Sequence, residues 1–131
     1  MNLSEHAEQA IVVRQLRESG YLVLSVPNEG QRTAATAARF AQRGLLPGAP
    51  DLLVLDPPPG YAGRPWVGLA IEFKRKKGGR LQVNQDAVLL RMSGLGWLTL
   101  VAHGAAAALE QLHLLGYRVG RLGPAALEAR L

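Results

Sequence analysis

The fold is decided by two stretches of the sequence, PDLLVL at residues 50–55 and IEFK at residues 71–74. Both are largely apolar and predict buried strands. Because successive side chains of a strand point to opposite faces, Glu72 and Lys74 share one face and Phe73 packs on the other. The second strand therefore has a core face and a charged face.

Pairing of these two strands would bring Asp51 and Glu72 together. Two carboxylates suit Mg²⁺, which takes oxygen ligands in octahedral geometry and leaves its other positions to water and substrate phosphate. The carbonyl of Phe73 is a further candidate ligand. Lys74 beside this cluster would orient the attacking water and offset negative charge that develops on the phosphate.

A purely structural role for Glu72 and Lys74 is the alternative, because surface strands often alternate these residue types as ion pairs. The apolar context of residues 66–74 argues against it. Charges inside an apolar strand are costly unless they have a partner or a metal ion.

The rest of the chain alternates helical and extended patterns. Helices are expected over residues 4–19, 33–43, 81–92 and 105–115. Strands are expected over residues 21–26, 51–55, 66–74 and 97–102, with a last strand and helical tail within 117–131. This order predicts a single domain, residues 1–131, of the α/β class, with a mixed central sheet flanked by helices.

The charge of the chain is basic and clustered. Lys and Arg number 15 against 10 Asp and Glu, for a formal net charge of +5, and five of these bases lie within residues 74–80. A clustered basic surface favours a polyanionic partner, because each neutralised phosphate releases counterions. A solvated run that only maintains solubility is the alternative.

The sequence has no cysteine, which excludes disulfides, thiolate metal sites and cysteine nucleophiles. The histidines, His6, His103 and His113, are scattered and are expected to be ordinary helix or strand-end residues. No stretch reaches the ~18 apolar residues of a membrane span, and the acidic first residues do not resemble a signal peptide. A soluble, cytoplasmic protein is expected.

Several further motifs occur in order: EHAEQ at 5–9, NEGQR at 28–32, a G-x-x-x-G-x-P-D stretch at 44–51, IEFK at 71–74, and a helix start at 81–85. Together they resemble the virus-type replication-repair nuclease (VRR-NUC) domain of the PD-(D/E)xK nucleases. The resemblance implies a restriction-endonuclease-like core. The sequence departs from the family at Glu29 and in an enlarged loop at 56–65.

The resemblance implies a nuclease that hydrolyses phosphodiester bonds in DNA with Mg²⁺ or Mn²⁺ as cofactor. It implies metal-binding roles for Asp51 and Glu72, a catalytic role for Lys74, and a supporting role for Gln85 on the following helix. Phage or mobile-element replication and repair fits the family.

The resemblance also implies a glutamate of the leading helix that completes the metal site. Glu5 is favoured, and Glu8, three residues on and on a similar face, is the alternative. Asn28, Gly30 and Arg32 match a family loop and are candidates for DNA binding, since a glycine lets backbone approach a phosphate closely. An ordinary turn is the alternative for this loop.

Basic residues that follow the second strand are candidates to track the DNA backbone: Arg75, Lys76, Lys77 and Arg80. Such contacts carry no base information, so recognition of branched DNA, a flap or a four-way (Holliday) junction, is expected. Stand-alone domains of the family resemble junction-resolving enzymes, which need two active sites. A homodimer is therefore expected, with residues 33–41 and the C-terminal helices as candidate interface.

Two other hypotheses remain open. An inert DNA-binding module would bind DNA equally with or without Mg²⁺. A restriction-type endonuclease on the same core would require a base sequence for cleavage and not a branch.

Overall fold

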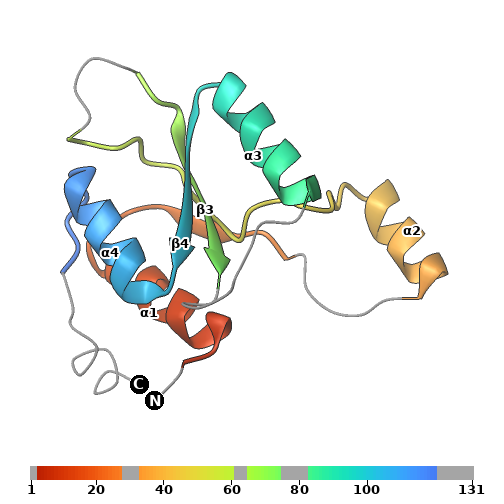
Figure 1. Ribbon diagram of the computed structural model, residues 1–131, viewed down its shortest axis with the longest axis horizontal. Helices are drawn as coiled ribbons and strands as arrows, with labels where there is room; N and C mark the ends of the chain where they lie inside the picture. The colour runs from red at the N-terminus through yellow and green to blue at the C-terminus, as the bar shows by residue number, and fades with distance from the viewer. Residues whose placement is uncertain (1–2, 28–32, 61–64, 75–82, 121–131) are drawn as a thin grey trace.

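The computed structural model describes residues 3–27, 33–60, 65–74 and 83–120, and Figure 1 shows their arrangement. The elements are α1 (Glu5–Glu18), β1 (Val23–Ser25), α2 (Ala34–Gln42), β2 (Leu52–Val54), β3 (Gly68–Lys74), α3 (Val83–Gly94), β4 (Trp97–His103) and α4 (Ala105–Leu114). The predicted α/β class is confirmed. No helix in these ranges is long and apolar enough to cross a membrane.

The strands form a mixed sheet in the order β1-β2-β3-β4. β1 pairs with β2 and β2 pairs with β3 in antiparallel fashion, while β3 and β4 are parallel. Helix α3 connects β3 to β4, as a parallel pair requires. The predicted pairing of the two deciding strands is confirmed, with Leu52 opposite Ile71.

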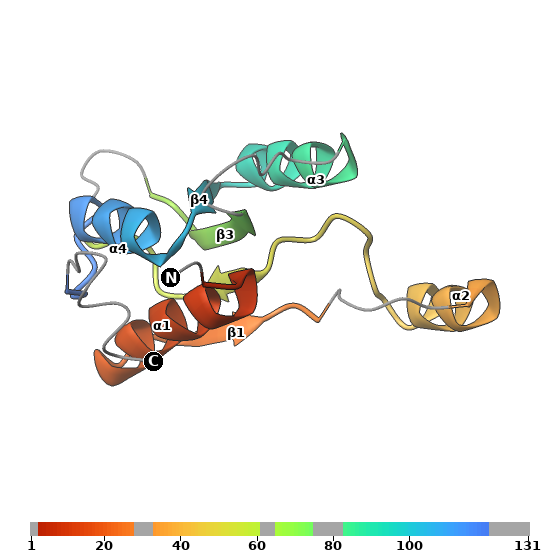
Figure 2. The ribbon, with the colours of Figure 1, turned by 60° about the horizontal axis from the view of Figure 1, so that its bottom comes forward.

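The core lies between the sheet and the pair of helices α1 and α4, which cover one face, while α3 lies on the other (Figure 2). Its centre is formed by side chains without solvent exposure from each layer, including Leu16 of α1, Ile71 of β3 and Leu109 of α4. Helix α1 begins at its N-cap Ser4, whose hydroxyl accepts a hydrogen bond from Ala7 N–H at 3.0 Å. This satisfies one of the unpaired donors at a helix start.

The observed elements differ from the predicted ones by one or two residues at their ends, and the strand predicted from residue 117 is absent from the described residues. β1 has three residues where residues 21–26 were expected to be extended. Tyr21, which lies before the strand, is buried and packs edge-on against Tyr117, with ring centroids 5.1 Å apart. The strand predicted from residue 117 is wrong for residues 117–120, which have no regular structure. Instead the Tyr117 hydroxyl donates to the Asp56 carbonyl at 2.8 Å. The predicted tail lies outside the described residues.

Helix α2 stands away from the rest of the described chain (Figures 1 and 2). None of its residues is buried, although its sequence is amphipathic. Its N-cap Thr33 accepts from Thr36 N–H at 3.1 Å, so local capping contributes to this helix. Its apolar side, which includes Phe40, is left exposed.

We expect Gly116→Ala to destabilise the fold strongly. Gly116 has a φ of +92°, and an added Cβ would lie 2.3 Å from the amide nitrogen of Gly60. Strain and overlap together should lower the free energy of unfolding by about 3 kcal/mol, measured by urea denaturation. Gly94→Ala is the matched control. Gly94 is the last residue of α3, and a Cβ added there would meet nothing within 4 Å. An equal effect of both changes would contradict the close contact at Gly116.

Candidate active site

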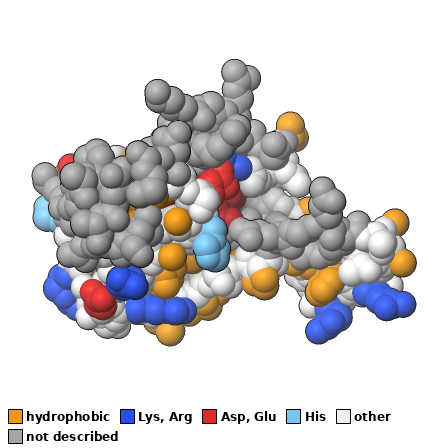
Figure 3. All heavy atoms as spheres, turned by 90° about the horizontal axis from the view of Figure 1, so that it is seen from below, with side chains coloured by type: hydrophobic (Ala, Val, Ile, Leu, Met, Phe, Trp, Pro, Cys, Tyr) orange, Lys and Arg blue, Asp and Glu red, His pale blue; other side chains and the backbone are white. Residues whose placement is uncertain are grey.

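Asp51 is fixed where β2 begins. Its carboxylate accepts a hydrogen bond from the Phe73 N–H at 2.7 Å, and its carbonyl accepts one from the Val26 N–H at 2.9 Å. The antiparallel register, with Leu52 opposite Ile71, places Asp51 across from Glu72. Seen from below, acidic side chains gather in the middle of this face with a basic side chain beside them (Figure 3).

Glu72 is a buried residue of β3 and lies between the core residues Ile71 and Phe73. It is 2% exposed, and its Oε2 has no hydrogen-bond partner among the described residues. Burial raises the pKa of Glu72 from 4.5 to about 9, helped by the hydrogen bond to Asp51 and the negative charge of that residue. Lys74 acts in the opposite direction. The Glu72 carboxyl is therefore protonated near neutral pH.

Lys74, half-buried at the end of β3, is held by α3. Its Nζ donates to Gln85 Oε1 at 2.8 Å. The backbone of α3 approaches the loop before β2 at this point: a Cβ on Gly48 would lie 2.6 Å from the Asn84 carbonyl carbon, and Gly48 has a φ of +87°. The glycine of the G-x-P-D stretch thus permits the contact that places Gln85 beside Lys74.

The two candidate glutamates of α1 lie in different surroundings. Glu5, the first residue of the helix, is exposed and close enough to Glu72 to raise the pKa of that carboxyl. Glu8 is 2% exposed and lies on the buried stripe of the helix. The electrostatic interaction with Glu72 favours Glu5, and the metal-binding role of either glutamate stays a prediction.

A divalent cation fits the pair formed by Asp51 and Glu72. The donors are oxygens, the Glu72 carboxyl is buried, and one of its oxygens has no hydrogen-bond partner among the described residues. A cation would replace the proton that now limits the charge of the pair. Among the described residues, no group of three or more His, Asp or Glu side chains is placed to hold a metal ion. Phe73 contributes its N–H to Asp51, and the role of its carbonyl stays a prediction.

The predicted DNA-binding residues lie outside the described residues: Asn28, Gly30, Arg32, Arg75, Lys76, Lys77 and Arg80.

Sequence reasoning missed three residues that line a cavity of about 260 Å³ together with Asp51. His6 and Gln9 come from α1, and Ser25 comes from β1. The separation of His6 and Gln9 by three residues places them on one helix face, which was the available signal. Ser25 carried no such signal, because its position depends on the pairing of β1 with β2.

The mixed sheet thus brings Asp51, Glu72 and Lys74 to one end of β3. The sequence profile of the VRR-NUC domain matches residues 3–106, and the chain belongs to this family. A solved structure described as a VRR_NUC domain protein shares its fold, with a TM-score of 0.63 and 18% identity over 94% of this chain and 95% of that one. No curated protein sequence matches the chain.

We expect the metal-free protein to lose stability as the pH rises from 4.5 toward 9, because the pKa of Glu72 is raised on folding. A raised pKa stabilises the fold below the unfolded value, and this contribution is lost as the pH approaches the folded value. Glu72→Gln should flatten this slope in unfolding experiments with a chelator present. Glu18→Gln on the exposed side of α1 is the control and should retain it. A wild-type slope in Glu72→Gln would contradict the burial of a protonated carboxyl.

Proposed function

We propose that the protein is a Mg²⁺- or Mn²⁺-dependent endonuclease that hydrolyses phosphodiester bonds in DNA. The observation that carries this proposal is the placement of Asp51 opposite the buried Glu72 at the end of the β2–β3 ladder, with Lys74 on the same face of β3. Membership of a nuclease family supports the reaction class.

In the proposed site, Asp51 and Glu72 hold the ion, and Glu5 and the Phe73 carbonyl are candidates to complete its ligands. When bound, the ion would polarise the phosphate and lower the pKa of a coordinated water. The Phe73 N–H fixes one oxygen of Asp51 at 2.7 Å. This bond orients the carboxylate before substrate arrives.

Lys74 supplies a positive charge that the reaction can use. Gln85 accepts from its ammonium at 2.8 Å and restrains the flexible side chain. An ammonium has three N–H donors, so the bond to Gln85 does not exhaust its capacity to donate to the water or the phosphate. Placed next to the carboxylate pair, Lys74 would orient the attacking water and stabilise charge on the phosphate in the transition state.

The proposed substrate is branched duplex DNA, cut without regard to base sequence. The formal net charge of +5 and the basic run at residues 74–80 support backbone contacts, which position a duplex without reading bases. Recognition would then depend on the shape of the DNA.

The test compares cleavage of labelled linear duplex, flap and four-way-junction DNA in Mg²⁺, in Mn²⁺ and with a chelator. We expect cutting only with metal, faster on branched DNA, and a loss of about 10²-fold or more in Asp51→Ala and Lys74→Ala. Arg91→Ala is the control for lost positive charge, because α3 runs away from Lys74 and Arg91 lies in its last turn.

Other outcomes of this assay favour the alternatives. DNA binding that is indifferent to metal, with no cutting by the wild type, would identify an inert binding module. Cutting of linear duplex at one base sequence would identify a restriction-type enzyme. An equal loss of cleavage in Arg91→Ala would show that the rate depends on the total positive charge of the protein and not on Lys74 at the site.

We further propose that the protein acts as a homodimer, since paired cuts across a junction need two active sites. Helix α2 supports this, because it is amphipathic, projects from the body and has no buried residue. Its exposed Phe40 and the nearby Leu46 offer an apolar surface to a second copy.

We expect Phe40→Asp to convert the dimer to a monomer in multi-angle light scattering, because a carboxylate would have to be buried at the interface. Leu90→Asp is the matched control on α3, where Leu90 is 73% exposed, and should leave the dimer intact. A wild-type protein that stays monomeric throughout the working concentration range would overturn the dimer.

A further inference from the structure

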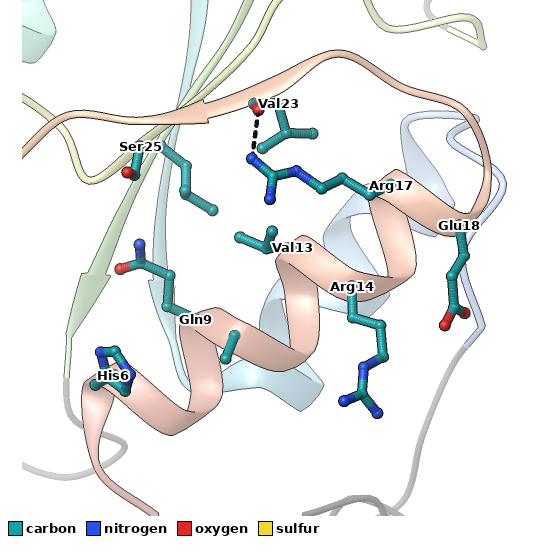
Figure 4. A pocket seen from close by; sticks show the side chains of 10 residues that line it. His6, Gln9, Val13, Arg14, Arg17, Glu18, Val23 and Ser25 are labelled. Atoms are coloured by element: carbon teal, nitrogen blue, oxygen red, sulfur yellow. Dashed lines mark hydrogen bonds between the residues drawn. The ribbon is translucent and has the colours of Figure 1, made fainter.

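A groove of about 470 Å³ runs between α1 and the edge strand β1 (Figure 4). Val13 of α1 and Val23 of β1 form part of its apolar floor, while Gln9 and Ser25 face each other near one end. Arg14 and Glu18 line it too, but their side chains point away from it in this view.

The groove leads to the candidate active site. His6, Gln9 and Ser25 line both this groove and the smaller cavity that contains Asp51. The two cavities therefore form one path along α1, with Asp51 at one end and Arg17 toward the other. A chain that passes the site of cleavage has a continuous surface to follow.

Arg17 makes the groove better suited to a nucleic acid than to a peptide strand. Its guanidinium donates to the Val23 carbonyl at 3.1 Å, so this backbone group of the edge strand is not available for strand addition. A guanidinium has five N–H donors, so this bond leaves it able to donate to a phosphate as well. The groove thus has a fixed positive charge at one end and an apolar floor on which a base can lie.

We propose that this groove takes the unpaired DNA strand that adjoins the scissile phosphate, with a backbone phosphate at Arg17 and a base on the floor at Val13 and Val23. Its volume of about 470 Å³ is in the range of small-ligand sites, about 300–1,000 Å³, and suits about one or two nucleotides and not a duplex. The proposal rests on the proposed nuclease function and names its substrate class as DNA with a single-stranded arm at the cut.

The first test is binding, which does not depend on cleavage. A labelled single-stranded oligonucleotide is titrated, by fluorescence anisotropy, into Lys74→Ala protein with or without Arg17→Gln. We expect Arg17→Gln to raise the Kd about tenfold and to reduce the slope of log K against log salt by about 0.7, the loss of one phosphate contact. Arg91→Gln, the same change of charge on α3, should leave both unchanged.

The second test is kinetic and uses otherwise wild-type protein. Arg17→Gln should raise KM for flap DNA about tenfold, with kcat and the KM for fully paired duplex within about twofold. Ser25→Asp, which places a negative charge on an exposed residue shared by both cavities, should have the same effect on KM without removing the Arg17 bond. Ser25→Asp also provides the test of the groove if Arg17→Gln unfolds the protein.

The outcomes separate the two proposals. Unchanged oligonucleotide binding in both Arg17→Gln and Ser25→Asp would overturn the groove, whether or not the protein cuts DNA. Equal weakening by Arg91→Gln would also overturn it, because the effect would then be general charge. Binding that depends on Arg17 in a protein that cuts no DNA would uphold the groove and overturn the nuclease.

Discussion

The hydrogen bond from the Phe73 N–H to the Asp51 carboxylate is the interaction on which the site depends. It joins β3 to the residue that precedes β2, over 2.7 Å, at the point where their ladder ends. Because Phe73 is also a core residue, 2% exposed, the packing of the hydrophobic core sets the position of the carboxylate. A shift of β3 by one residue would move Phe73 to the charged face and Glu72 into the core.

Much of the fold could be predicted because it follows from local patterns. The apolar runs gave β2, β3 and β4, and the alternation along β3 separated Phe73 from Glu72 and Lys74. The predictions that failed depend on contacts between distant residues. Tyr21, expected within the first strand, lies before it and packs on Tyr117, which is anchored to the Asp56 carbonyl. No local pattern indicates such a contact.

The candidate site shows the same division. Strand periodicity predicts that Asp51, Glu72 and Lys74 lie together, and the family motif points to Gln85, which accepts from Lys74. The sequence contains no local signal that Gly48 contacts the start of α3. That glycine matters because Gln85 can restrain Lys74 only if α3 begins close to the loop before β2. The reason for the motif glycine therefore becomes clear only from the packing.

The charge of the site connects stability with function. Two adjacent carboxyls, one of them buried, are tolerated near neutral pH because the raised pKa of Glu72 keeps that carboxyl protonated. A bound divalent cation would supply the missing charge and release that proton, so metal binding and proton release are coupled at this position. Replacing Asp51 and Glu72 by apolar residues would remove the electrostatic cost of burying Glu72, and it would also remove the oxygens that could bind a cation. The raised pKa of Glu72 is therefore a consequence of burying a carboxyl inside an otherwise apolar strand, where the proposed function would use it to hold a cation.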